Sequence, residues 1–95
     1  MNKYELTVIF KPTLEEEAAK AEADKVSDLI QNLGGTVEKI DEWGKRKLAY
    51  EIAKFEDGIY YLYYFSAEKT APKELESRLR IQENVIRYLI INPEE

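Results

Sequence analysis

The order in which two hydrophobic periods follow one another along the chain is the strongest constraint on its fold. A period of two, typical of β-strands, occurs at residues 3–11, 36–53, 59–67 and 85–91. A period of three to four, typical of amphipathic helices, occurs at residues 14–33 and 70–84. The order strand, helix, strand, strand, helix, strand predicts an α+β, ferredoxin-like βαββαβ fold. Such a fold is a four-stranded antiparallel sheet with both helices on one face.

Local signals predict where these elements begin and end. Thr13 and Glu16 have the spacing of a capping box at the start of the first helix. Residues 34–35 are both glycine and supply the left-handed end of that helix. Gly44 predicts a bend or bulge inside one long second strand. Residues 55–58 carry the predicted turn into the third strand, so these two strands form a hairpin.

The length of 95 residues predicts a single domain over residues 1–95, because one hydrophobic core usually serves a chain of this size. With 44% hydrophobic residues the chain is expected to bury such a core. The longest apolar runs, at residues 59–65 and 88–91, are far shorter than the roughly 20 residues of a membrane helix. We therefore expect no membrane span and no signal peptide.

Cysteine and histidine are both absent from the sequence. Their absence excludes disulfides, thiolate nucleophiles, zinc sites of the Cys/His type and histidine-centred catalytic triads. Most enzyme mechanisms are thereby excluded, and we expect no metal or other cofactor. A chain without cysteine is also compatible with the reducing cytoplasm, which is the expected location.

Two of the predicted strands are apolar on both faces, at residues 59–65 and 88–91. Only one face of the predicted sheet meets the helices, so the other, open face is expected to carry a contiguous apolar patch. Such patches usually mark a site for a protein partner. A hydrated, tyrosine-rich surface is the alternative. The candidate partner-binding residues are Ile9, Tyr60, Leu62, Tyr64, Leu89 and Ile91.

Positive charge is concentrated in one segment of an acidic chain. The net charge is −5, yet residues 44–54 sum to +3 and the remainder to −8. Cations beside the aromatic Tyr50 predict contact with phosphates and stacking on nucleobases. The alternative is that residues 45–47 are gatekeepers that protect a hairpin from aggregation.

Residues 43–54, WGKRKLAYEIAK, resemble the signature of bacterial small-subunit ribosomal protein six. The resemblance extends to residues 3–5 (KYE), the glycines at 34–35, Gly58 before an aromatic strand, and residues 79–87 (LRIQENVIR). It implies the βαββαβ fold and a non-catalytic component of the cytoplasmic ribosome. It further implies binding to the central domain of 16S ribosomal RNA, together with small-subunit ribosomal protein eighteen, during assembly of the platform. No small-molecule substrate is implied.

The same resemblance makes several basic and aromatic residues candidates for RNA contact. They are Lys3, Lys45, Arg46, Lys47, Tyr50, Lys54, Arg80 and Arg87. Leu48 and Ile52, within the signature, are instead expected in the core.

Three other protein classes share the predicted topology. An RNA-recognition motif would place a basic-Gly-aromatic pattern on the third strand, which residues 57–61 (DGIYY) match poorly. A small-molecule regulatory domain would bury the apolar patch in a homodimer. An acylphosphatase-like enzyme needs a glycine-rich phosphate loop, whereas residues 11–16 contain no glycine and two glutamates.

Overall fold

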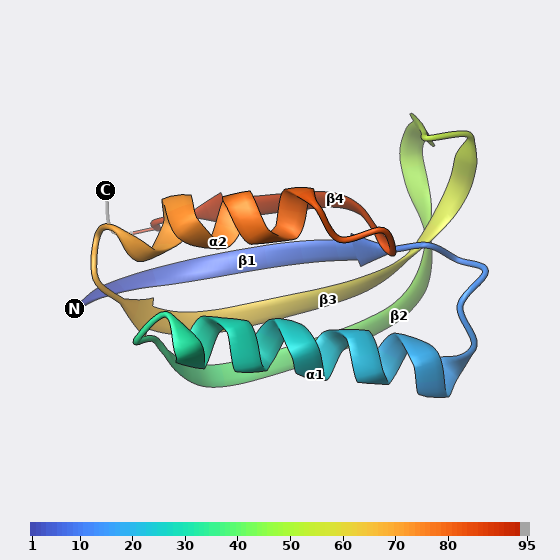
Figure 1. The fold of residues 1–95 in the computed structure, drawn as a ribbon. Helices are drawn as coiled ribbons and strands as arrows, with labels where there is room; N and C mark the ends of the chain where they lie inside the picture. The colour runs from blue at the N-terminus through green and yellow to red at the C-terminus, as the bar shows by residue number, and fades with distance from the viewer. Residues whose placement is uncertain (94–95) are drawn as a thin grey trace.

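The computed structural model describes residues 1–93 and confirms the predicted order of elements (Figure 1). The elements are β1 (Asn2–Phe10), α1 (Glu16–Asn32), β2 (Thr36–Ile52), β3 (Phe55–Ala67), α2 (Ala71–Arg80) and β4 (Val85–Ile91). The four strands form one sheet in the order β2-β3-β1-β4, with every pair of neighbours antiparallel. Both helices cover the same face of this sheet, which leaves the other face open (Figure 1).

The core lies between the helices and the inner face of the sheet. Alternate residues of β1 and β3 point into it, as the strand period of two requires. The sheet contributes Tyr4, Leu6, Val8, Phe10, Ile59, Tyr61, Tyr63, Phe65 and Ala67. The helices contribute Ala19, Ala23, Val26, Ile30, Ala71, Leu75 and Leu79. Burying each large apolar side chain stabilises the fold by about 1.5–3 kcal/mol.

The start of α1 differs from the prediction. Helix α1 begins at Glu16, its N-cap residue is Glu15, and no side chain caps it, so the predicted capping box is wrong. Thr13 lies instead in a turn closed by a 3.3 Å hydrogen bond from the Leu14 N–H to the Lys11 carbonyl. The chain uses this turn to pass from the sheet layer to the helix layer, which delays the first helical turn.

The ends of the helices follow local hydrogen bonding. Gly34, with φ of +85°, ends α1 in the left-handed conformation, as predicted. Helix α2 ends at Arg80, before the predicted limit at residue 84. There the Gln82 N–H donates to the Leu79 carbonyl at 3.1 Å, which turns the chain toward β4. Within residues 1–93, no helix has the length and apolar character that crossing a bilayer requires.

The β2–β3 hairpin has its turn at a different place from the predicted one. Residues 55–58 belong to β3, and the turn consists of Ala53 and Lys54, with φ of +51° and +70°. Two consecutive positive φ angles are characteristic of a two-residue type I′ turn. Gly58 is required for another reason: a Cβ atom there would lie 2.2 Å from Cγ2 of Ile9. A close approach between strands, rather than a turn, explains this glycine.

The predicted irregularity at Gly44 is confirmed. The register between β2 and β3 shifts between Glu42 and Gly44, and Gly44 has φ of +77°. Strand β2 nevertheless continues as one element to Ile52. Beyond this bulge the hairpin leaves the plane of the sheet and rises toward the side of β4 (Figure 1). The segment from residue 43 to residue 60 is called the hairpin end below.

Candidate nucleic-acid and protein interface

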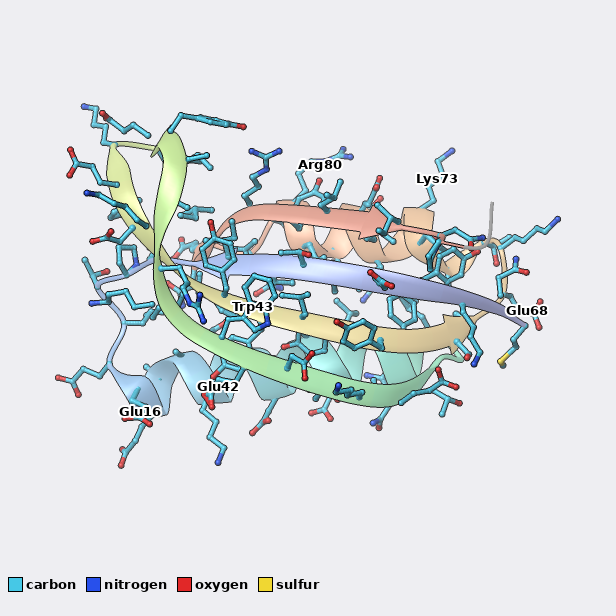
Figure 2. The ribbon with its side chains drawn as sticks, turned by 180° about the vertical axis from the view of Figure 1, so that it is seen from behind. Glu16, Glu42, Trp43, Glu68, Lys73 and Arg80 are labelled. Atoms are coloured by element: carbon cyan, nitrogen blue, oxygen red, sulfur yellow. The ribbon has the colours of Figure 1, made fainter. Side chains whose placement is uncertain are left out.

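The strand register determines which side chains lie on the open face, which is turned toward the viewer in Figure 2. Thr7 pairs with Leu62 on β3 and Leu89 on β4, and Glu5 pairs with Tyr64 and Ile91. Directly paired residues point to the same side of a sheet. All six predicted partner-binding residues therefore lie on the open face, and their role in binding stays a prediction.

Ile9 differs from the other five in exposure. Its side chain is only 6% exposed, and it lies in contact with Gly58 beneath the hairpin end. By contrast, Leu89 and Ile91 are 52% and 45% exposed. Ile9 offers almost no surface, because the bent hairpin covers it. The Trp43 ring is stacked on Tyr60, so the apolar patch available to a partner consists of Leu62, Tyr64, Leu89 and Ile91.

The three consecutive cations of the hairpin do not share one face. Lys45, Arg46 and Lys47 pair in turn with Ile59, Gly58 and Asp57 of β3. Side chains alternate across a strand, so Arg46 lies on the side opposite to its two lysine neighbours. The folded hairpin also adds two carboxylates, Glu56 and Asp57, to the predicted basic segment. Residues 44–58 then contain four cations and three carboxylates. The positive and negative charges of residues 44–58 therefore nearly balance. Of the three consecutive cations, Arg46 is the one that lies on the open face.

Trp43 joins Arg46 to the sheet. The Arg46 guanidinium lies 5.5 Å from the centre of the Trp43 ring, and its Nε donates a 3.3 Å hydrogen bond to the Trp43 carbonyl. The Trp43 ring is stacked on Tyr60, with centroids 6.2 Å apart and planes at 19°. Trp43 is 46% exposed. It lies at the base of the hairpin on the face seen in Figure 2.

Tyr50 and Arg87 form a second cation–aromatic pair. The Arg87 guanidinium lies 5.6 Å from the centre of the Tyr50 ring and donates a hydrogen bond to its hydroxyl group. This contact holds the hairpin end over β4. Both residues of the pair line a groove of about 180 Å³ whose lining also includes Ile9 and Leu48. Leu48, predicted in the core, is buried, and Ile52 is half-buried.

These two pairs belong to one transverse row of the sheet. Ile9 on β1 pairs with Tyr60 on one side and Arg87 on the other, and Tyr60 pairs with Gly44. The row therefore runs from the bulge in β2 to the start of β4. We call it the cation–aromatic row, and its members are Trp43, Arg46, Tyr50, Tyr60 and Arg87.

The other RNA candidates lie away from this row. Lys3 is at the opposite end of the sheet, 4.0 Å from Glu38. Lys54 forms part of the hairpin turn. Arg80 projects beyond the outer edge of β4 (Figure 2), and a hydrogen bond to Tyr88 raises the pKa of its guanidinium. The structure thus brings together only part of the predicted RNA site.

A second hollow, of about 410 Å³, separates the start of α1 from the bulge in β2. Its wall contains Glu16 and Glu42, both labelled in Figure 2. The Tyr61 hydroxyl donates a 2.8 Å hydrogen bond to Glu42, and burial together with this contact raises the pKa of Tyr61 to about 12. The lining of this hollow contains two carboxylates and one cation, Lys45, so the hollow is poorly suited to phosphate. Within residues 1–93, no group of three or more acidic side chains is arranged to hold a metal ion.

Comparison with known proteins assigns the family. The sequence profile described as "Ribosomal protein S6" matches residues 3–92. The chain is 50% identical over 94 residues to a small ribosomal subunit protein bS6 of Clostridium botulinum, covering 99% of this chain and 100% of that one. It is 47% identical to the bS6 protein of Clostridium kluyveri, over the full length of both. The chain belongs to the ribosomal protein S6 family.

Structural comparison agrees with this assignment. The crystal structure of the 30S ribosomal protein S6 from Thermotoga maritima superposes with a TM-score of 0.90 at 32% identity, covering 95% of this chain and 85% of that one. As an S6 protein, the chain is a non-enzymatic component of the small subunit of the cytoplasmic ribosome. This confirms the expected family, fold and absence of catalysis. The regulatory-domain and acylphosphatase-like interpretations no longer apply.

One residue of the cation–aromatic row, Trp43, is not among the RNA-contact candidates predicted from the sequence, although it carries the contact between Arg46 and the sheet. A signal was present: it is the single tryptophan of the chain and directly precedes Gly44, beside three cations. The bulge decides the direction of its side chain, and a periodic pattern cannot place a residue at a bulge.

Proposed function

We propose that this chain binds the central domain of 16S ribosomal RNA through its hairpin end. We further propose that it packs against small-subunit ribosomal protein eighteen through the apolar patch during assembly of the platform. The observation that carries the proposal is the cation–aromatic row next to an exposed apolar patch on the same open face. Two surfaces of different chemistry on one face suit two different partners.

The RNA part rests on the chemistry of the row. Guanidinium groups contact phosphates in a bidentate manner and stack on bases, and exposed aromatic rings stack on unpaired bases. Tyr50 and Trp43 are 60% and 46% exposed, and each contacts an arginine. Because the row lies at one end of the sheet, the RNA is expected at the hairpin end. An RNA-recognition motif would instead bind RNA across the middle of its sheet.

The protein part rests on exposed apolar surface. Leu89 and Ile91 are about half exposed on a strand at the edge of the sheet, and Leu62 lies beside them across β1. Exposed apolar side chains that adjoin one another favour a protein partner, because removing them from water contributes roughly 25 cal/mol per Å². Phosphates gain nothing from such a surface.

The decisive experiment titrates a central-domain fragment of 16S RNA with the purified protein, with and without protein eighteen, over a series of salt concentrations. If about four to six phosphates are neutralised, the log–log slope of affinity against salt is about −3 to −5. We expect tight binding only when both proteins are present. Affinity that does not depend on salt would contradict the electrostatic part, and no binding under either condition would contradict the proposal as a whole.

Two variants separate the surfaces. Replacing Lys45, Arg46 and Lys47 together by alanine is expected to weaken RNA binding and preserve the fold, since all three side chains are exposed. Unchanged RNA affinity would instead favour their role as gatekeepers. Leu62→Asp is expected to impair association with protein eighteen, because Leu62 lies on the open face rather than in the core. The thermal unfolding of both variants, measured by circular dichroism, is the control.

A further inference from the structure

Glu5 is an acidic residue in the middle of an apolar surface. It lies on the interior strand β1, directly between Tyr64 of β3 and Ile91 of β4. Leu62 and Leu89 are its diagonal neighbours on the same face, one pair further along the sheet. Its side chain is only half exposed. The apolar patch therefore surrounds a carboxylate.

Within residues 1–93, no ion pair neutralises this carboxylate. In the part of the chain that the structure describes, Lys3 is paired with Glu38, Lys39 with Asp41 and Lys25 with Glu22, and no ion pair involves Glu5. Lys39 is further occupied by Tyr64, whose ring centre lies 5.7 Å from its Nζ. Among the described residues, Glu5 thus has no basic side chain as an ion-pair partner.

A second carboxylate adds to the negative character of this area. Asp41 lies on the same face across from Leu62. Burial, then Asp41 and then Glu5 raise the pKa of the Tyr64 hydroxyl, and the nearby Lys39 lowers it. Lys3 and Lys39 on this half of the open face are paired with Glu38 and Asp41, so Glu5 leaves it with an excess of negative charge, in contrast to the hairpin end. The two acids favour a protein partner over RNA at the patch.

Covering the patch would remove water from Glu5. A carboxylate that loses its hydration without gaining a cation is strongly unfavourable, and burial becomes tolerable only when an opposite charge and hydrogen bonds replace the water. A partner that covers Leu62, Leu89 and Ile91 must also cover Glu5, because it lies between them. The partner surface must therefore combine apolar side chains with a cation.

We propose that Glu5 determines the specificity of the protein interface by pairing with a lysine or arginine from an apolar, basic segment of the partner. This proposal rests on the proposed function, in which the partner at this face is small-subunit ribosomal protein eighteen. A partner with apolar side chains but no cation at this point is rejected, because its docking leaves Glu5 buried and unpaired. The apolar patch supplies contact area, and Glu5 selects which apolar segment can use it.

The test measures the affinity of the purified full-length chain for purified protein eighteen in the absence of RNA. Glu5→Gln keeps the size of the side chain and removes its charge, and it is expected to weaken binding at least about 10-fold. Glu5→Asp, which keeps the charge, is expected to retain most of the affinity. Glu17→Gln, on an exposed position of α1, makes the same change of net charge away from the sheet and is the matched control.

Each outcome separates this inference from the proposed function. Wild-type affinity in Glu5→Gln, together with lost binding in Leu62→Asp, would retain the interface and overturn the role of Glu5. Equal losses of affinity in Glu5→Gln and Glu17→Gln would attribute the effect to net charge and would also overturn the role of Glu5. An increase in RNA affinity in Glu5→Gln would show that RNA covers the patch. If the wild-type chain binds RNA but does not bind protein eighteen, the proposed protein interface itself is wrong.

Discussion

Arg87 of β4 and Tyr50 of the hairpin end are in direct contact although they are 37 residues apart in the sequence. The guanidinium lies 5.6 Å from the centre of the tyrosine ring and donates a hydrogen bond to its hydroxyl. Since the hairpin leaves the plane of the sheet beyond Gly44, this contact links its distal part to the opposite edge strand (Figure 1). The pair holds a surface proposed to bind RNA in a defined position before any RNA is present.

Loss of this contact is expected to loosen the hairpin without unfolding the protein. An exposed cation–aromatic pair contributes about 0.5–1 kcal/mol. Arg87→Ala should therefore accelerate amide hydrogen exchange in residues 48–56 by roughly 2- to 5-fold, with little change in the core strands. Arg78→Ala, an exposed arginine on α2, is the control. Unchanged exchange in the hairpin would show that its position does not depend on Arg87.

Gly58→Ala is expected to destabilise the fold by about 1–3 kcal/mol, because the new methyl group would overlap with Ile9 in a packed region. Chemical denaturation measures this change. Gly44→Ala is the contrasting variant: nothing lies within 4 Å of a Cβ there, and its φ of +77° alone makes alanine unfavourable by about 1 kcal/mol.

A double-mutant cycle tests the cause of the Gly58 effect. If the overlap with Ile9 is responsible, Gly58→Ala combined with Ile9→Ala is less destabilising than the sum of the two single changes. Additive losses would assign the effect of Gly58→Ala to the backbone of the hairpin instead.

The stability of the protein is expected to fall at alkaline pH. Burial and the contact with Glu42 raise the pKa of Tyr61 from 10.0 to about 12 in the folded state. A raised pKa stabilises the fold below pH 10, and this contribution is lost as the pH rises from 10 through 12, because only the unfolded chain releases the proton readily. Tyr61 accounts for a loss of about 2 kcal/mol between pH 9 and 11.5.

Urea denaturation at these two pH values measures this loss. Tyr61→Phe has no proton to release at this position, so its stability should fall by about 2 kcal/mol less than that of the wild type over the same range. The buried Tyr63, whose pKa is also raised by burial, keeps some alkaline dependence in both proteins. An identical pH dependence of the two proteins would contradict the assignment to Tyr61.

The proposed RNA surface predicts a role for the single tryptophan. Trp43→Ala is expected to reduce affinity for the 16S fragment, measured with protein eighteen present, by about 1–3 kcal/mol, the usual contribution of one stacked base. Trp43→Phe should recover part of this loss. Ile40→Ala is the control. Ile40 is another exposed apolar residue on β2, but its side chain points to the opposite face of the sheet.

Fluorescence gives an independent measurement, since the chain has one tryptophan. RNA binding should change the emission of Trp43 in the wild-type protein. Unaltered emission together with full affinity in Trp43→Ala would exclude base stacking at this site.

The alternation of hydrophobic periods determined most of the fold. Each of the six elements was predicted in its observed order, because burial of one face imposes a period of two on a strand and 3.6 on a helix. The left-handed end of α1 at Gly34 and the bulge at Gly44 were also evident from the sequence, since φ values of +85° and +77° favour glycine strongly. These features depend on neighbours within a few residues.

Tertiary structure alone decided the details of the surface. Whether Ile9 is accessible depends on the hairpin end, much later in the chain, which bends over it. The separation of Arg46 from Lys45 and Lys47 depends on the register with β3. Tyr50 meets Arg87 only because the bulge at Gly44 redirects the hairpin. A sequence period reports which side of its own element a residue occupies, whereas these contacts depend on how distant elements are placed against one another.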